Sequence, residues 1–338
     1  MTPAGSRFWA QARRWTPGLV ISAVAIYAIL RIVKWQDLQL SFAAIHWEYL
    51  LIATLIVTVS LILRAIAWKT LLDGKPTVKQ AFFAICVGYL LNNLFPFRFG
   101  ELGRSVLLGR SSRVGTFRVF STVIIERALD VGVAALLLLT TLPLVLGTEW
   151  IKKAAWSALA LVVLAFVLLF LMAWNKTWVE NVLSKISLKW PGFKNIQARI
   201  LQPLLDGLGA LRHPSQFLIA AGLILAAWGL WVANYYVMLA PIVPETIFWW
   251  AAFINAVLAL GVALPSAPAA LGVYEAAMVA ALVLLGVSES TALAYAILMH
   301  FFQFVYTGIM GFTGLLLEGQ SLSTIFNEVS MREKQPSS

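Results

Sequence analysis

The chain becomes polar within one stretch, which reads Asn92-Asn93-Leu94-Phe95-Pro96-Phe97-Arg98-Phe99-Gly100-Glu101-Leu102-Gly103-Arg104. The apolar helical arm before it, 80–94, is shorter than the roughly 20 residues that a membrane-spanning helix needs. The stretch itself holds two amides, a proline, two glycines and three charged side chains. Broken backbone and charge are tolerated at membrane depth only where they pack inside protein or line a wet cavity. We therefore predict that this stretch is the working site.

The composition is that of an integral membrane protein. Of the 338 residues, 61% are hydrophobic and 12% are charged, whereas an ordinary soluble domain is about 45–50% apolar and about 25% charged. The single cysteine, Cys86, lies in an apolar segment and excludes an intrachain disulfide and a thiolate metal cluster. We interpret Cys86 as a small packing residue.

The pattern of apolar runs predicts an all-α polytopic membrane protein with about six full transmembrane helices and two re-entrant broken hairpins. The full helices are predicted over 16–33, 48–72, 118–146, 154–174, 217–240 and 291–317. An amphipathic segment at 175–214 carries apolar residues at three- and four-residue spacing and is expected on the cytoplasmic surface. A single membrane domain, 16–317, thus lies between a cytoplasmic N-terminus, 1–15, and a cytoplasmic tail, 318–338.

The distribution of basic residues predicts the orientation through the positive-inside rule. If the first broken segment re-enters, 19 of the 25 Lys and Arg residues fall on one side, and Lys34, Lys152 and Lys153 fall on the other. The remaining three fall within predicted helices and are not counted: Arg31, Arg64 and Arg127. If that segment crossed the membrane instead, the arginine cluster after the break would fall on the opposite side and the asymmetry would be lost. We therefore expect both termini in the cytoplasm. Most of the net charge of +10 is then explained by basic residues that set the orientation of the chain in the membrane. Nucleic acid is therefore not an expected partner.

Two broken elements, about 80–108 and 247–286, resemble each other. Each has an apolar arm, a break at proline and glycine, and a second arm that carries charge. The residues expected to form the bends and close contacts are Gly88, Pro96, Gly100, Gly103, Pro265, Pro268 and Gly272. Three crossings separate the elements, so they enter from opposite sides, as in an inverted repeat. Such a pair indicates a transporter with its substrate site between the breaks; the alternative is two ordinary helices that are merely kinked.

The first candidate site group lies in the charged segment that follows the first break. Arg98, Glu101 and Arg104 form one stripe if the restart is helical. Two arginines beside the free amides of a helix N-terminus suit a phosphate, and Asn92 and Asn93 are polar neighbours. The alternative is a self-neutralised cluster that locks the hairpin.

The second candidate group, Glu126, Arg127 and Asp130, lies in the predicted helix 118–146. Glu126 and Asp130 share a helix face and need a cationic partner, for which Arg98, Arg104 or Arg127 is suited. We expect a buried ion network; the alternative is a solvated cluster at the interface. Arg64, in contrast, is expected to extend to the interface.

The third candidate group joins Glu275 to His300 and Gln303, which lie one helical turn apart. A carboxylate and an imidazole inside a membrane can relay protons or bind a headgroup; a satisfied packing histidine is the alternative. Tyr274 and the tryptophans are interpreted as interface anchors. The sequence has no phosphate-binding Gly-rich loop, zinc-protease motif, nucleophile elbow or Cys/His metal spacing, so we expect no metal and no cofactor.

Three motifs, in order, resemble those of one family. The stretch from Gly88 to Arg104 resembles the signature N…P-x-R-x-G-E-x-x-R. Glu126-Arg127-Ala128-Leu129-Asp130 is similar to E-R-x-x-D, and 265–275 is similar to P-x-x-P-G-G-x-G-x-x-E, with Ala269-Ala270 in place of the glycine pair. These motifs are those of the flippase-like family named for the transmembrane region of lysylphosphatidylglycerol synthase, and the resemblance covers about 16–317.

The resemblance implies a bacterial or archaeal inner-membrane protein, related to domains that move a charged phospholipid between leaflets. Because the soluble aminoacyl-transfer domain of full-length synthases is missing from the sequence, the chain is not expected to aminoacylate a lipid.

We therefore expect a translocase for a phospholipid or lipid-linked anionic molecule. Its phosphate would be bound by Arg98 and Arg104. These arginines would be held by Glu101, Glu126 and Asp130, and Glu275 would act from the second hairpin. The sequence leaves open whether the lipid moves passively or by coupling to an ion. It also leaves open whether the protein forms a homo-oligomer. The alternatives are an intramembrane headgroup transferase with Glu101 or Glu126 as general base, and a non-catalytic partner of a lipid-modifying enzyme.

Overall fold

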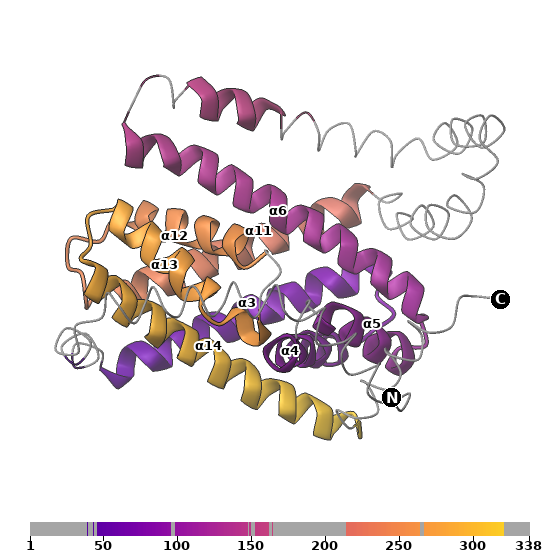
Figure 1. Ribbon diagram of the computed structural model, residues 1–338. Helices are drawn as coiled ribbons and strands as arrows, with labels where there is room; N and C mark the ends of the chain where they lie inside the picture. The colour runs from indigo at the N-terminus through magenta and orange to yellow at the C-terminus, as the bar shows by residue number, and fades with distance from the viewer. Residues whose placement is uncertain are drawn as a thin grey trace, which may run out of the picture.

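The computed structural model describes residues 46–95, 99–147, 153–161, 214–263 and 267–320, together with the single positions Gln39, Ala43, Glu149 and Leu164. These ranges are helical and contain no strand (Figure 1). The labelled elements are α3 (Trp47–Leu71), α4 (Val78–Leu94), α5 (Phe99–Ser111), α6 (Thr116–Leu146), α11 (Pro214–Leu239), α12 (Phe248–Gly261), η3 (Pro268–Ala270), α13 (Val273–Leu284) and α14 (Glu289–Leu317). The predicted all-α class is confirmed for the described part of the chain.

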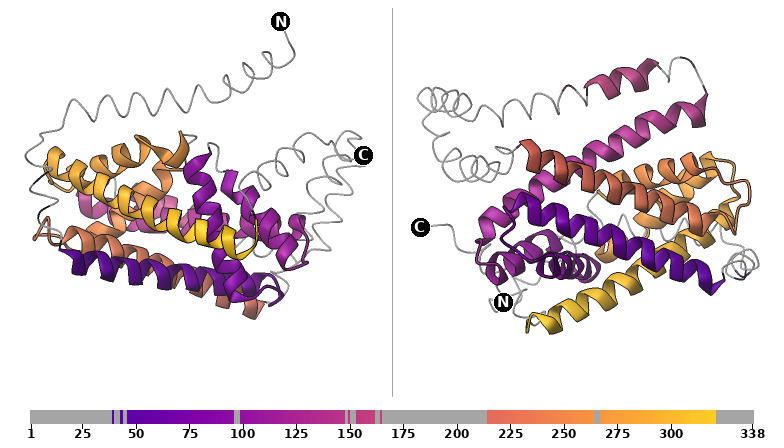
Figure 2. Two further views of the ribbon diagram at one scale, coloured as in Figure 1. Left: turned by 90° about the horizontal axis from the view of Figure 1, so that it is seen from below. Right: turned by 180° about the vertical axis from the view of Figure 1, so that it is seen from behind.

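Within the described residues, four helices are long and apolar enough to cross a membrane: α3, α6, α11 and α14. They correspond to four of the six predicted spans. The predictions that lie wholly or mostly outside the described residues are the spans 16–33 and 154–174, the amphipathic segment 175–214, the N-terminus 1–15 and most of the tail 318–338. The helices α3 and α11 run side by side in both views of Figure 2 and share an extensive contact.

The first broken element is an antiparallel helical hairpin made of α4 and α5. A capping box at Thr77 and Gln80 begins α4, and Gln80 Nε2 donates a 3.1 Å hydrogen bond to the Ser111 carbonyl at the far end of α5. Near the bend the two backbones touch, because a Cβ on Gly100 would lie only 1.8 Å from the Gly88 carbonyl oxygen. Only glycine fits there, so the first turn of α5 lies directly against α4.

The second broken element consists of α12, η3 and α13, with α12 packed against α13. Its bend includes Gly272, the N-cap of α13, whose φ of +81° favours glycine. Pro268 begins η3 and Gly103 is buried within α5, whereas Pro96 and Pro265 lie outside the described residues. Because η3 contacts α4, the bend of the second hairpin lies against the first helix of the first hairpin. The side of the membrane from which each hairpin enters stays a prediction.

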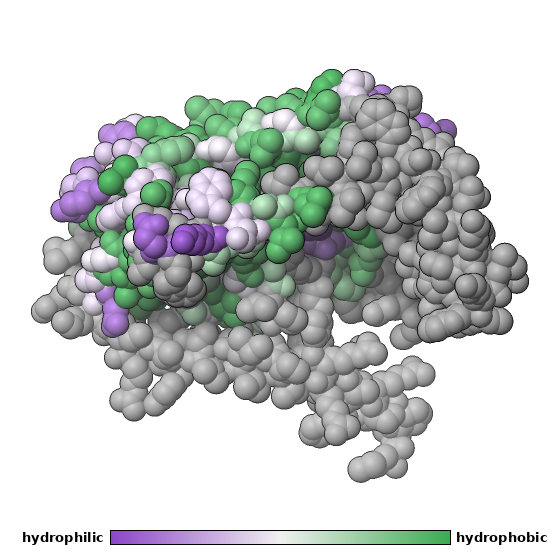
Figure 3. Space-filling model, turned by 90° about the horizontal axis from the view of Figure 1, so that it is seen from above, coloured by the Kyte–Doolittle hydropathy of each residue, from purple (hydrophilic) through white to green (hydrophobic). Residues whose placement is uncertain are grey.

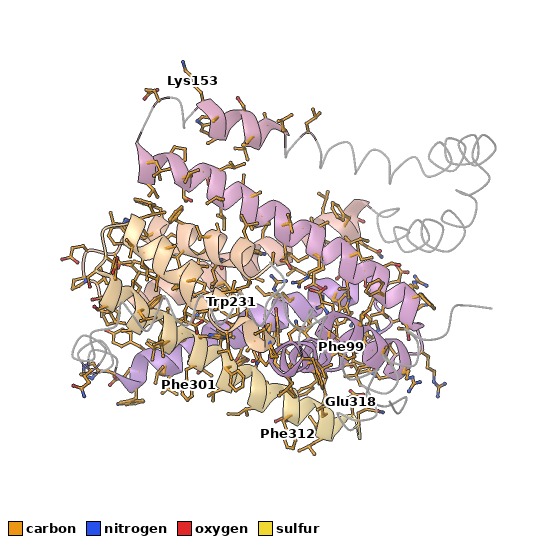
Figure 4. All side chains as sticks on the ribbon, in the orientation of Figure 1. Phe99, Lys153, Trp231, Phe301, Phe312 and Glu318 are labelled. Carbon is orange, nitrogen blue, oxygen red and sulfur yellow. The ribbon has the colours of Figure 1, made fainter. Side chains whose placement is uncertain are left out.

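The outer surface of the bundle is apolar. Figure 3 shows hydrophobic residues over much of the described face, and Phe301 and Phe312 of α14 are 68% and 55% exposed. Figure 4 shows Phe312 at the outer edge of α14 and Trp231 among the central helices. Exposed apolar surface of this extent marks an interaction site, and on spanning helices its natural partner is lipid. Cys86, in contrast, is 1% exposed in the core around α4, which confirms its interpretation as a packing residue.

Candidate functional site

An ion network joins the first hairpin to α3 and α6, and its centre is the pair Arg64–Asp130. Arg64 Nη2 donates to Asp130 Oδ1 at 2.8 Å, and Arg64 Nη1 donates to Asp130 Oδ2 at 3.2 Å. The same Nη1 lies 3.0 Å from Glu126 Oε1. The three residues are 4–8% exposed, so each charge depends on its partners for stabilisation.

Arg104 brings α5 into this network. Its Nη2 lies 3.1 Å from Glu126 Oε2, and its guanidinium lies over the Trp68 ring, 4.9 Å from the ring centroid. Trp68 is itself oriented by a 2.9 Å hydrogen bond from its Nε1 to Thr122 Oγ1. Arg104 is therefore held by a carboxylate and an aromatic face at the same time.

Arg127 connects the network to Glu101 of α5. Its Nη2 lies 3.0 Å from Glu126 Oε1 and 3.0 Å from Asp130 Oδ2, whereas its Nε is 3.9 Å from Glu101 Oε1. The side chain is 29% exposed. Three guanidinium groups thus surround Glu126, and the predicted ion network between the first hairpin and helix 118–146 is present.

The prediction that Arg64 extends to the interface is wrong. Arg64 is 6% exposed and lies between the buried residues Ser60 and Trp68, one helical turn to either side on the same face of α3. The burial of these neighbours is a result of packing and was not visible in the sequence. The sequence did show that the carboxylates of Glu126 and Asp130 need more cationic charge than Arg127 supplies, but it did not identify Arg64 as the source.

The tryptophans and Tyr274 are not all interface anchors, which corrects a second interpretation. Trp228 of α11 is 6% exposed and donates a 2.7 Å hydrogen bond from Nε1 to Asp130 Oδ1. Tyr274 is 4% exposed and stacks on His300 with ring centroids 4.2 Å apart. Both rings belong to the site because each contacts one of its polar side chains and lines the cavity described below.

The second polar group surrounds His300 of α14. His300 Nδ1 lies 2.5 Å from Glu275 Oε1, and His300 Nε2 lies 2.9 Å from the Ala269 carbonyl oxygen. The other carboxylate oxygen of Glu275 accepts a 2.7 Å hydrogen bond from the Gly272 N–H and so caps α13. The predicted association of Glu275 with His300 is therefore present, and it also includes the backbone of η3.

A cavity of about 660 Å³ extends between these two groups, which is within the usual range of ligand sites. Its polar lining consists of Arg64, Asn92, Asn93, Glu101, Arg127, Asp130, Asn255, His300 and Gln303. Its aromatic lining includes Tyr89, Trp228, Trp231, Tyr235 and Tyr274. Sequence reasoning missed Asn255 and this aromatic wall, because a single amide or ring in an apolar run has no pattern that distinguishes a cavity wall from packing.

The remaining predicted site residues are placed as follows. Arg104, Glu126 and Glu275 lie behind the cavity wall and support it, and Arg98 lies outside the described residues. Asn92 Oδ1 accepts a 2.8 Å hydrogen bond from the Gly100 N–H in the first turn of α5. Its neighbour Asn93 ties α4 to α14. The two amides therefore shape the hairpin tip as well as line the cavity.

The loop of the second hairpin has a left-handed backbone at Ala269 and Ala270, with φ of +57° and +56°. A side chain with a Cβ makes this conformation unfavourable by roughly 1–2 kcal/mol per residue, whereas glycine adopts it freely. The family motif has glycines at these two positions. In this chain two alanines therefore adopt a conformation for which glycine is better suited.

The comparisons with known proteins identify the family. The family model for the "Lysylphosphatidylglycerol synthase TM region" matches residues 15–311. The chain is also similar to the "UPF0104 membrane protein MJ1595" of Methanocaldococcus jannaschii, with 22% identity over 323 residues that cover 88% of this chain and 93% of that protein. No solved structure matches. The chain is therefore an integral membrane protein that belongs to the family of the lysylphosphatidylglycerol synthase transmembrane region.

Proposed function

We propose that this protein is a translocase that moves a phospholipid or a lipid-linked anionic molecule between the leaflets of the cytoplasmic membrane. The observation that carries the proposal is the cavity of about 660 Å³ at the meeting point of two broken helical hairpins. Discontinuous helices that meet near the middle of a membrane are typical of transporter substrate sites. The hairpins would enter from opposite sides, with both termini in the cytoplasm.

The charged wall of the cavity suits a phosphate. Arg64 and Arg127 both line it, and guanidinium groups bind phosphate through paired charge-assisted hydrogen bonds. Arg127 is the better candidate for direct contact, because it is the more exposed and its pair with Glu101, at 3.9 Å, is longer than its pairs with Glu126 and Asp130. Arg64 and Arg104 would hold the network in place while Arg127 changes partner.

A leaflet-exchange assay tests this proposal. The purified protein is reconstituted into vesicles of phosphatidylethanolamine and phosphatidylglycerol that contain a fluorescent phospholipid, and the outer-leaflet label is reduced chemically. Wild-type protein should expose the inner-leaflet label, and Arg127→Gln should slow the exchange about tenfold, because hydrogen bonds to charged groups contribute roughly 1.5–3 kcal/mol.

The matched control is Arg118→Gln, which removes an arginine of the same helix, α6. Arg118 pairs with Asp73 at the surface and does not line the cavity, so its exchange rate should equal that of wild type. Exchange no faster with wild-type protein than in protein-free vesicles would exclude the translocase.

A headgroup transferase is the second candidate, and Glu101 is the observation that favours it, because this carboxylate lines the cavity. Glu126 is a poorer general base, since it lies behind the wall and is 4% exposed. The two functions differ in their products. A transferase generates a lipid of new mass in extracts of cells that overproduce the protein, and this product disappears with Glu101→Gln, whereas a translocase leaves all lipid masses unchanged.

A further inference from the structure

The hydrogen bonds of His300 restrict the protons that it can carry. A carbonyl oxygen accepts hydrogen bonds and cannot donate, so His300 Nε2, 2.9 Å from the Ala269 oxygen, must bear a hydrogen. On the other side of the ring, Nδ1 lies 2.5 Å from Glu275 Oε1. One proton must lie between these two atoms, either on the imidazole or on the carboxyl group. In both cases the pair has no net charge.

We propose that Glu275 and His300 form a proton-binding site whose loading and release drive the movement of the lipid substrate. The proposal rests on the translocase function and specifies its coupling ion. The ligand is a single proton, taken up from water that enters the cavity from one side and released to the other side in each cycle. No bond other than those to this proton is made or broken.

The hydrogen bonds of the pair depend on its protonation state. If a second proton binds, the carboxylate that accepts from Nδ1 and from the Gly272 N–H becomes a neutral acid, which weakens both hydrogen bonds. If the shared proton leaves, the lone pair of Nδ1 faces a carboxylate oxygen 2.5 Å away, which is repulsive. Either change therefore favours separation of His300 from Glu275. The pair is therefore a two-state element that a proton can bias.

Separation of the pair would move the tip of the second hairpin. Glu275 holds the Gly272 N–H, and His300 holds the Ala269 carbonyl and stacks on Tyr274. Ala269, Ala270, Tyr274 and His300 all line the cavity. The left-handed backbone at Ala269 and Ala270 is unfavourable for alanine, so release of its carbonyl favours a rearrangement. A proton bound at this pair can thus change the shape of the substrate site.

In the described part of the cavity lining, the charged groups other than this pair all belong to the ion network. Among the described residues that line the cavity, α13 contributes the titratable Tyr274, α4 contributes Tyr89 and α11 contributes Tyr235. From α12 only the neutral amide Asn255 is polar, and η3 carries no titratable side chain. The charged groups of the cavity wall are Arg64, Glu101, Arg127 and Asp130, which belong to the ion network at its other end.

The first experiment observes the proton directly and requires no transport. The chain has three histidines, so histidine labelled with ¹⁵N gives few signals in protein held in lipid nanodiscs, and His300→Gln identifies the signal of interest. We expect the protonation of the His300 ring nitrogens to depend on Glu275, so that their signals change with pH differently in wild type and in Glu275→Gln. The variant His46→Gln, at an exposed position, should leave the signal unchanged. A His300 signal with the same titration in wild type and in Glu275→Gln would overturn the proton site.

The second experiment tests the coupling. Vesicles with an enclosed pH-sensitive dye and a fluorescent phospholipid report proton entry and leaflet exchange together. For one coupled proton, the exchange rate should change by up to about tenfold per pH unit of an imposed gradient, and this dependence should be lost in His300→Gln. An exchange rate that does not depend on the gradient would overturn the proposed coupling but not the proposed translocase function. No exchange by wild-type protein, with a normal His300 titration, would instead exclude the translocase.

Discussion

The two ends of the cavity solve the problem of buried charge in different ways. At the first end, three arginines and three carboxylates from α3, α5 and α6 neutralise one another through several ion pairs. At the second end, one carboxylate faces one imidazole. Arginine stays charged at every physiological pH, whereas histidine changes its charge within that range. The comparison contrasts a wall of permanent, mutually neutralising charges with a wall that, in our proposal, a proton can alter.

The largest expected effect is the difference in lost stability between a variant at the first end and a variant at the second end. Glu126→Gln leaves three guanidinium groups around a neutral amide, and loss of one partner from a buried ion pair costs roughly 3–5 kcal/mol. Glu275→Gln should cost less, about 1–3 kcal/mol, because the imidazole beside it can give up its charge. Unfolding of both variants in mixed micelles measures the two free energies. Equal losses would contradict the distinction between the two ends.

The next effect compares the close contacts within the two hairpins. In Gly100→Ala the new Cβ would lie 1.8 Å from the Gly88 carbonyl oxygen, which is backbone and cannot move away. In Gly261→Ala the new Cβ would lie 2.8 Å from Ala277 Cβ, a smaller overlap that a slight separation of α12 from α13 relieves. We expect Gly100→Ala to lower the free energy of unfolding by about 3 kcal/mol or more and Gly261→Ala by about 1 kcal/mol. Gly222→Ala is the control, since its Cβ meets nothing within 4 Å. A Gly261→Ala loss as large as that of Gly100→Ala would show that the hairpins are equally tight.

The smallest effect concerns the backbone of the second hairpin. Ala269→Gly and Ala270→Gly should each raise the free energy of unfolding by about 1 kcal/mol, because glycine adopts the left-handed conformation without strain. Ala267→Gly, whose φ is −59°, should instead lower stability slightly through the entropy of the unfolded chain. The same unfolding titration compares all three. If glycine at 269 and 270 lowered stability instead, the packing of the alanine side chains would contribute more free energy than the strained backbone costs.

The candidate site could be predicted where its residues form a local pattern. Glu126 and Asp130 were identified because residues four apart share a helix face, and Glu101 and Arg104 because they follow a break in the same short segment. Arg64 was assigned to the wrong environment. A single arginine within an apolar helix has the same local sequence whether it faces an interface or a partner helix, and only the packing of α3 against α6 distinguishes the two cases.

The sequence by itself determined the helical membrane class, the positions of the two breaks and the charged face of α6. These properties depend on hydropathy, on proline and glycine, and on helical spacing, all of which act over a few residues. Only the tertiary structure decided that η3 lies against α4, that Arg64 reaches Asp130 across 66 positions, and that His300 meets Glu275 across 25. Such contacts arise from how whole helices pack, and no short segment of the sequence contains both partners.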